Sequence, residues 1–272
     1  METGLAGKTV IVTGGNANIG KGIVLAFAAE GANVVIVARD QTQGLKVAAN
    51  AKELGAPDAL WVQADVLKLP EVEAMAQRTL DRFGKIDVLV NNVGGNVDFK
   101  PFVETAPDQW QREIELNLMS TLNCTRTVLP HMIQNHSGRI INIGSTAGLV
   151  GDSQCSVYSA TKGAIHAFTK VLAKEVGCHG ITVNAVCPWA TMPDNPEEDT
   201  STGSRYHPTL GFIIKRRASN PKGQSQLMRK CAVERSCARP AEIGAAAVYL
   251  ASDAASFTTG HLLGVDGGTL LM

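Results

Sequence analysis

The sequence lacks the features of a membrane, secreted or metal-binding protein. No apolar run approaches the roughly 20 residues needed to span a bilayer, and the first residues carry no basic-then-apolar signal. Positive and negative side chains balance at 25 each, which leaves no overall field for nucleic acid or an anionic membrane. The six cysteines form no C-x-x-C pair. We therefore expect reduced thiols, no metal site and a cytoplasmic protein that binds neither nucleic acid nor membrane.

The length and composition suit one globular α/β domain. The chain has 272 residues, of which 44% are hydrophobic and 18% charged, so it can bury a full core. It shows no internal repeat and no low-complexity block. We expect a single domain over residues 1–272, with two smaller domains as the alternative.

Short β-branched runs alternate along the chain with longer segments that carry apolar residues at helical spacing. This pattern predicts seven strands, at residues 9–13, 33–37, 59–62, 88–91, 139–143, 182–186 and 261–265. It predicts helices at residues 21–30, 71–83, 110–129, 158–176 and 241–251. Parallel strands need crossover helices, so the alternation indicates a Rossmann-like, doubly wound parallel sheet with helices on both faces.

One segment breaks this rhythm. Residues 189–233 are rich in Pro, Gly, Ser and Thr and too long for an ordinary connection, so we expect a substrate loop at about 189–235. Between Thr200 and Val233 it contains no Asp or Glu but seven basic residues, Arg205, Lys215, Arg216, Arg217, Lys222, Arg229 and Lys230. They suggest an anionic substrate, such as a 3-oxoacyl or cyclic hydroxyacyl thioester of coenzyme A. A solvated loop or a subunit contact also explains these basic residues, and this is the favoured interpretation.

A glycine-rich turn follows the first predicted strand and opens the first helix. It reads T-G-G-N-A-N-I-G-K-G, from Thr13 to Gly22. Glycines allow a tight turn and a close backbone approach, and the N-terminus of the next helix attracts a pyrophosphate. Such a turn alone is weak evidence, but its place between strand and helix favours a dinucleotide site.

Tyr158 and Lys162 lie four residues apart in a predicted helix and so share one face of it. A phenol beside an ammonium group is an acid/base unit, because a neighbouring positive charge favours the phenolate. Chance also produces such a pair in many chains of this length. The pair therefore gains meaning only from its neighbours.

Together the motifs resemble the short-chain dehydrogenase/reductase family, in its short rather than its extended type. The family's T-G-x-x-x-G-x-G turn matches at Thr13, Gly14 and Gly20, whereas the extended type would place a glycine at Ala17. The family's middle glycine is Asn18 here, and asparagine tolerates left-handed backbone angles better than most residues. The resemblance implies that this turn binds a dinucleotide.

The resemblance continues in order along nearly the whole chain. Further matching positions are Asp65 in A-D-V, Asn91 to Gly94 in N-N-V-G, Asn117 in E-L-N-L, Ser145 in I-N-I-G-S, Tyr158 and Lys162, Pro188, Thr191, and Thr259 to Gly268 in the last strand. Trp189 stands where the family has the glycine of a P-G turn. Asn117, Ser145, Tyr158 and Lys162 match the family's Asn-Ser-Tyr-Lys tetrad.

The resemblance implies an NAD(P)-dependent oxidoreductase that interconverts a secondary alcohol and a ketone. Tyr158 would exchange the proton with the substrate oxygen, and Lys162 would lower the pKa of Tyr158 and bond the nicotinamide ribose. Ser145 would hold the substrate oxygen, and Asn117 would hold a water in the proton relay. A catalytically impaired binding or scaffolding member is the alternative that Asn18 and Trp189 leave open, and an isomerase or dehydratase comes third.

The same resemblance assigns the remaining contacts and the assembly. The implied cofactor contacts are Thr13, Gly14, Asn16, Asn18, Ile19, Gly20, Arg39, Asp65, Val66, Asn91, Val93, Gly94, Tyr158, Lys162, Pro188, Trp189 and Thr191. The implied substrate contacts are Ser145, Gln154, Tyr158 and Trp189. A homotetramer or homodimer is implied, formed through the helices around Asn117 and Tyr158 and through the C-terminal strand.

The end of the second predicted strand, V-V-I-V-A-R-D, bears on the choice of cofactor. An acidic residue there would bond the ribose 2′-hydroxyl and select NAD(H), but that position is Ala38. Arg39 follows it and can pair with the 2′-phosphate of NADP(H). NADP(H) is therefore favoured, with NAD(H) possible if Asp40 reaches the ribose through a different register.

Overall fold

In the computed structural model, which describes residues 2–201, 204, 206–211 and 230–270, the strands form one parallel sheet in the order β3-β2-β1-β4-β5-β6-β7. The strands are β1 Thr9–Thr13, β2 Asn33–Ala38, β3 Ala59–Gln63, β4 Val88–Asn91, β5 Gly138–Ile143, β6 Ile181–Pro188 and β7 Leu262–Val265. Strands β2 and β3 follow β1 on one side, and β4 to β7 follow it on the other, so the strand order switches sides between β1 and β4. Open α/β sheets bind their ligands at such a switch point. The predicted seven-stranded doubly wound fold is confirmed.

Helices cover both faces of the sheet. They are α1 Asn18–Ala29, α2 Gln41–Glu53, α3 Leu69–Phe83, α4 Pro107–Ile114, α5 Ser120–Gln134, α6 Ala147–Val150, α7 Ser156–Val176, α8 Pro196–Asp199 and α10 Pro240–Ala251. Short 3₁₀ turns occur at Phe102–Glu104, Gly177–His179 and Asp253–Ala255, and a π-helical turn occupies Glu115–Met119. None of the described helices is long and apolar enough to cross a bilayer.

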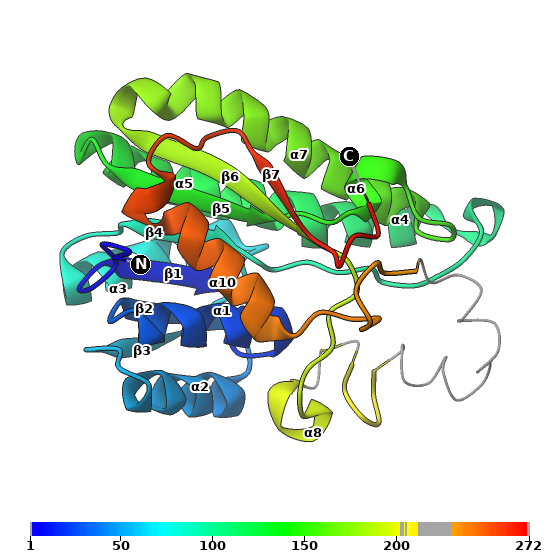
Figure 1. Ribbon diagram of the computed structural model, residues 1–272, viewed down its shortest axis with the longest axis horizontal. Coiled ribbons are helices and arrows are strands. Elements are labelled where there is room, and N and C mark those ends of the chain that lie inside the picture. Colours follow the sequence, from blue (N-terminus) through cyan, green and yellow to red (C-terminus); the bar gives the residue numbers. More distant parts are fainter. Residues whose placement is uncertain (1, 202–203, 205, 212–229, 271–272) are drawn as a thin grey trace.

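Alternation along the strands divides the core into two halves. In β1, Val10 and Val12 face a cluster that includes α1, α2 and α10, whereas Ile11 faces a cluster that includes α3, α5 and α7. Because successive side chains of a strand point to opposite faces, one run of apolar residues supports both layers. Figure 1 shows α1 and α10 lying in front of the strands and α5 behind them.

The structure differs from the predicted helices at the junction of α4 and α5 and in helices that the sequence pattern did not predict. The single helix predicted at 110–129 is α4 and α5, joined by the π-helical turn. Two hydroxyls donate back to carbonyls one turn earlier at this junction, Ser120 to Leu116 at 2.7 Å and Thr121 to Asn117 at 3.3 Å. A π-helical turn contains one residue more than an α-helical turn, and the spacing of apolar residues in the sequence does not show where such a turn occurs.

Helix α2 and the four-residue helices α6 and α8 are not among the helices predicted from the sequence. The buried residues of α2 are Gly44, Val47, Ala48 and Ala51. Three of these four side chains are small, so the apolar stripe is weak in the sequence although it packs well against the sheet.

Candidate active site

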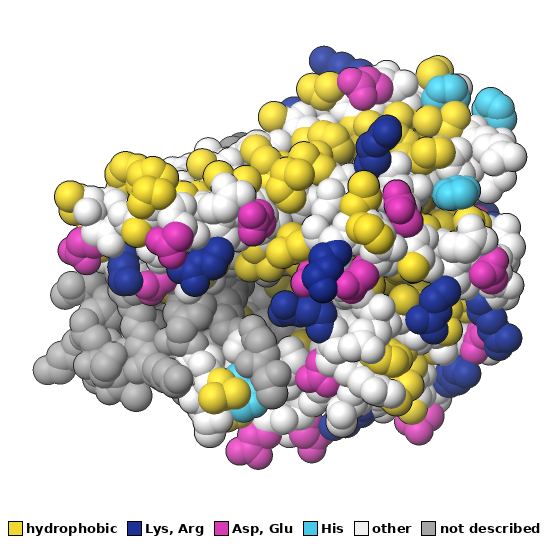
Figure 2. All heavy atoms as spheres, turned by 180° about the vertical axis from the view of Figure 1, so that it is seen from behind, with side chains coloured by type: hydrophobic (Ala, Val, Ile, Leu, Met, Phe, Trp, Pro, Cys, Tyr) yellow, Lys and Arg dark blue, Asp and Glu magenta, His cyan; other side chains and the backbone are white. Residues whose placement is uncertain are grey.

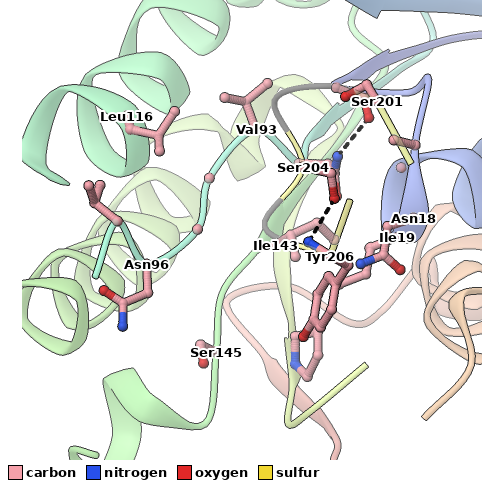
Figure 3. A pocket seen from close by; sticks show the side chains of 18 of the residues that line it. Asn18, Ile19, Val93, Asn96, Leu116, Ile143, Ser145, Ser201, Ser204 and Tyr206 are labelled. Atoms are coloured by element: carbon pink, nitrogen blue, oxygen red, sulfur yellow. Dashed lines mark hydrogen bonds between the residues drawn. The ribbon is translucent and has the colours of Figure 1, made fainter. Parts of the chain in front are cut away.

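A cavity of about 510 Å³ opens at the carboxyl ends of the strands. Its lining comes from the turn after β1, the loop after β4, the residues after β5 and the segment after β6, with further residues from α7, from the π-helical turn and from just after the end of β2. The volume is in the range of sites that hold small molecules and cofactors. Figure 3 shows Ser145 and Asn96 on one side of this cavity and Tyr206, Asn18 and Ile19 on the other.

The turn after β1 has the geometry of a phosphate-binding loop. Asn18 begins α1 with a φ of 41°. It stands where the family's turn has a glycine, and it adopts the left-handed conformation that asparagine tolerates better than most residues. A side chain on Gly20 would meet the Gly14 carbonyl oxygen at 2.0 Å, so the turn requires glycine there. The Oδ1 atom of Asn18 is buried with no hydrogen-bond partner among the described residues. These features fit a bound dinucleotide, whose phosphates the N-terminus of α1 would hold.

A second hollow of about 380 Å³ adjoins the first and shares Gly14, Asn16 and Arg39 with it. Its far side is formed by Asp65 and Val66, as expected for the adenosine half of a dinucleotide. Ala38 is the last residue of β2 and exposed Arg39 follows it, as the sequence register predicts.

Asp40 is already engaged beside this hollow. Its carboxylate accepts from the Gln43 backbone N–H at 3.1 Å and caps α2. Arg39, in contrast, forms no ion pair with the described residues. Arg39 is therefore the charged group best placed to meet a phosphate at this end of the site.

The loop after β4 is held against the glycine-rich turn. The Thr13 hydroxyl accepts from the backbone N–H groups of Asn92 at 2.9 Å and Val93 at 3.1 Å. Gly94 makes room in the cavity wall, because a Cβ there would lie 2.8 Å from Asn117 Oδ1 and 3.0 Å from Lys162 Nζ. Asn117 from the π-helical turn and Lys162 from α7 therefore both lie close to Gly94.

Three of the four expected tetrad residues line the cavity, namely Ser145, Tyr158 and Lys162. Tyr158 and Lys162 share one face of α7, with Lys162 Nζ 5.8 Å from the centre of the Tyr158 ring. The Lys162 ammonium is buried and donates to the Ile143 carbonyl at 2.8 Å. The Ser145 hydroxyl accepts from the Ala147 N–H at 3.1 Å. A buried ammonium, a phenol and a hydroxyl at one edge of the sheet form a site suited to proton transfer.

Five residues expected at the site lie outside the lining of these hollows. They are Thr13, Asn91, Asn117, Gln154 and Thr191. Thr13 supports the loop after β4, as described above, and the Asn91 carboxamide donates within the sheet to Asn142 at 2.9 Å. Thr191 is buried and pairs with Ala238.

Gln154 and Asn117 form hydrogen bonds with backbone groups of neighbouring segments. The Gln154 carbonyl accepts from the Lys100 N–H at 3.2 Å, and its φ of 65° is left-handed. Asn117 is fully buried behind the loop after β4 and bonds Gly95. Motif matches identify these positions but do not show which way each side chain faces.

Several lining residues are not identified by the sequence motifs. They include Asn96, Leu116, Ser201, Ser204, Tyr206 and Leu210. Asn96 follows the N-N-V-G motif by two residues, and the last four fall in the segment that breaks the strand and helix rhythm. Of the seven basic residues noted there, only Lys230 is described, and it is exposed. Arg205, Lys215, Arg216, Arg217, Lys222 and Arg229 lie outside the described residues.

An ion pair holds part of this segment against the cofactor side. Lys21 at the start of α1 pairs with Asp199 of α8 at 2.5 Å, and both side chains are largely buried. The Gln43 amide also donates to the Thr200 carbonyl at 3.4 Å. These contacts lie next to Ser201, which lines both hollows. The Ser204 N–H donates to the Ser201 carbonyl at 2.8 Å, and the Tyr206 N–H donates to the Ser204 hydroxyl at 3.2 Å (dashed lines in Figure 3).

A neutral histidine supports Ser145 from behind. His166 Nε2 accepts from the Ser145 N–H at 3.4 Å and lies 3.3 Å from Cys187 Sγ. Burial lowers the pKa of His166 to about 4, and the charge of Lys162 acts in the same direction. Burial raises the pKa of the Cys187 thiol to about 12. Both groups are therefore neutral near pH 7, so they act as a support and not as a reactive thiolate pair.

We expect His166 to make the fold less stable in mild acid. Between pH 6.5 and 4 the unfolded chain protonates this histidine and the native chain does not, so stability falls as the pH falls. The loss reaches about 2 kcal/mol by pH 4.5. Urea unfolding at pH 7 and pH 4.5 measures it, by comparing wild type with His166→Gln. The same loss of stability in wild type and in His166→Gln would contradict this role. His261→Gln, at an exposed position, is the control and should lose as much stability as wild type.

Comparisons with known proteins agree with this geometry. The family model of the short chain dehydrogenases matches residues 8–202, and a model described as enoyl-(acyl carrier protein) reductase matches residues 211–269. The chain is 36% identical to L-fucose dehydrogenase of Bos taurus, over 100% of this chain and 92% of that protein. It is also 36% identical to 3-oxoacyl-[acyl-carrier-protein] reductase of Synechocystis sp., over 99% of both chains.

A solved structure supports the same assignment. The crystal structure of gox2181 superposes with a TM-score of 0.85 at 27% identity, over 97% of this chain and 96% of that one. The model match covers more than half of the chain, and the fold and the cavity are those expected for the family. The chain therefore belongs to the short-chain dehydrogenase/reductase family, and it is an NAD(P)-dependent enzyme of the class that interconverts CH–OH groups and carbonyls.

Proposed function

We propose that this enzyme interconverts a secondary alcohol and a ketone, with Tyr158 as the general acid and base and Asn117 in its proton relay. The observation that carries the proposal is the convergence of Ser145, Tyr158 and Lys162 on one cavity that also contains the glycine-rich turn. A phenol needs a substrate oxygen within hydrogen-bonding reach, and Ser145 provides a second group that can hold that oxygen.

The chain's own residues orient the reaction. The nicotinamide cofactor supplies or accepts the hydride when it is bound. Lys162 is held by the Ile143 carbonyl, which fixes its ammonium beside Tyr158. Ser145 is fixed at two atoms, its N–H by His166 and its hydroxyl by Ala147. Fixed donors of this kind lower the barrier because they need no reorganisation during the reaction.

A substrate screen tests this function. Purified enzyme is mixed with NADPH or NADH and a panel of ketones, and in reverse with hydroxy acids and hydroxyacyl thioesters. We expect cofactor oxidation with at least one ketone. Failure to bind either nicotinamide cofactor would favour the scaffolding alternative, and turnover without net oxidation of free cofactor would favour an isomerase or dehydratase.

We propose that NADP(H) is the preferred cofactor, because Arg39 follows β2 while Asp40 caps α2. Arg39→Ala is expected to lower kcat/KM for NADP(H) by about 10- to 100-fold, the worth of one charged hydrogen bond. Values for NAD(H) should stay within about threefold. Steady-state kinetics with both cofactors measures this, with the exposed Arg112→Ala as a matched control. A wild-type preference for NAD(H) would overturn the assignment.

The substrate class is a finer proposal. A 3-oxoacyl or cyclic hydroxyacyl thioester, or another anionic substrate, is supported by the basic residues between 205 and 230 and by the name of the Synechocystis relative. The proposed substrate loop at about 189–235 belongs to the same single catalytic domain of residues 1–272. A solvated basic segment remains the competing interpretation, and the thioester arm of the screen distinguishes the two.

We also propose a homotetramer or a homodimer. Figure 2 shows hydrophobic side chains gathered along the upper part of one face of the molecule. Among the described residues, Ile114, Met119 and Val171 are 37%, 40% and 53% exposed, and they belong to α4, the π-helical turn and α7. These helices are the ones the family resemblance implies in assembly, and burying apolar side chains between subunits would stabilise it.

A further inference from the structure

A buried carboxylate lies directly behind the proposed site. Glu113, near the end of α4, is only 4% exposed. Burying a carboxylate is costly unless its oxygens accept hydrogen bonds. Glu113 Oε1 accepts from the Val97 backbone N–H at 2.7 Å, and Oε2 accepts from Asn117 Nδ2 at 3.2 Å. The carboxylate therefore connects the loop after β4 with the expected tetrad asparagine.

These contacts fix the orientation of the Asn117 carboxamide. Its Nδ2 faces three acceptors, the carbonyls of Gly95 at 3.1 Å and Glu113 at 2.9 Å and the Glu113 carboxylate. Its Oδ1 accepts from the Gly95 N–H at 2.9 Å. Because the two ends of a carboxamide differ only in donors and acceptors, the surrounding groups decide which way it points. Here Glu113 supplies two of those groups.

The loop that Glu113 and Asn117 hold forms part of the cavity wall. Residues 94–97 line the cavity, and the chain is fastened at Gly95 by Asn117 and at Val97 by Glu113. Lys162 Nζ would lie 3.0 Å from a Cβ on Gly94. A displacement of this loop would therefore move the wall against which the Lys162 ammonium rests.

We propose that Glu113 is a positioning residue of this enzyme, which acts through Asn117 and the 94–97 loop. The inference rests on the proposed function, in which Asn117 belongs to the proton relay. The carboxylate suits this place because it offers two acceptor oxygens to two donors. A glutamine of the same shape has one acceptor oxygen, and its amide group would face a donor.

A double-mutant cycle tests the proposal. Glu113→Gln, Asn117→Ala and the double variant are compared by kcat and KM at saturating cofactor. We expect Glu113→Gln to lower kcat by about 10- to 100-fold with KM within about threefold, the loss of a hydrogen bond to a charged group. In the Asn117→Ala background the same substitution should lower kcat by a smaller factor than in wild type, because, of the two contacts above, only that of Glu113 with the Val97 N–H is left to lose. Glu115→Gln is the matched control, because that half-buried side chain accepts from Gln111 at 2.7 Å and lines neither hollow.

Each other outcome overturns a defined part of the proposal. Unchanged kcat in Glu113→Gln, or losses that multiply in the double variant, would show that Glu113 does not act through Asn117. Full activity of Asn117→Ala would instead remove Asn117 from the proton relay, a failure of the proposed function that is visible without Glu113. If Glu113→Gln does not fold, Glu113→Asp, which keeps both acceptor oxygens on a shorter side chain, takes its place in the cycle.

Discussion

Replacing Tyr158 with phenylalanine is expected to lower kcat by about a thousandfold or more, within the usual range for loss of a general acid or base. The substitution removes the phenol oxygen and keeps the ring beside Lys162. Cofactor binding should stay within about threefold of wild type, because the glycine-rich turn and Arg39 are untouched. Single-turnover kinetics and titration of cofactor fluorescence measure the two effects separately.

Tyr249→Phe is the matched control for this variant. Tyr249 lies on α10 and is 37% exposed, away from the residues that line the cavity. Its loss should leave turnover unchanged. If Tyr158→Phe kept more than about a tenth of wild-type kcat, the proton would have to reach the substrate oxygen by another group.

A methyl group at Gly20 is expected to weaken cofactor binding at least about tenfold and to destabilise the fold by about 1–3 kcal/mol. The new Cβ would lie 2.0 Å from the Gly14 carbonyl oxygen and 2.6 Å from Asn92 Nδ2. The first of these is backbone, so the glycine-rich turn itself must shift. Isothermal titration with NADPH and urea unfolding of Gly20→Ala measure the two losses.

Gly177→Ala separates this effect from a general cost of replacing glycine. Gly177 has a helical φ of −59°, and a Cβ there would meet nothing within 4 Å. That variant should bind cofactor normally and unfold at the same or a higher urea concentration. Normal NADPH affinity in Gly20→Ala would mean that the turn after β1 does not hold the dinucleotide.

The sequence predicts the frame of the site because strand ends and glycines are local features. The strands at 9–13 and 88–91 end where predicted, so the turn after β1 and the N-N-V-G loop meet at the carboxyl edge of the sheet. The left-handed backbone of Asn18 could be expected from the chemistry of asparagine alone. Ser145 and Lys162 also lie where the motifs place them, lining the cavity.

The remaining features depend on contacts between distant segments. Glu113 is an acidic residue in a polar stretch and reads as an exposed position, yet it is buried because Val97 and Asn117 both donate to it. Ser201 lines both hollows next to the ion pair of Lys21 and Asp199, which joins residues 178 positions apart in the sequence. No periodicity in the sequence encodes such pairings, so the motifs alone could not have identified these residues.

The most direct test of the central claim follows deuterium from the substrate. With a secondary alcohol deuterated at its carbinol carbon, wild-type enzyme should yield one deuterium in the reduced nicotinamide cofactor per ketone formed, measured by mass spectrometry, and Tyr158→Phe should yield almost none. Ketone formed without deuterium in the cofactor would contradict hydride transfer as the reaction of this enzyme.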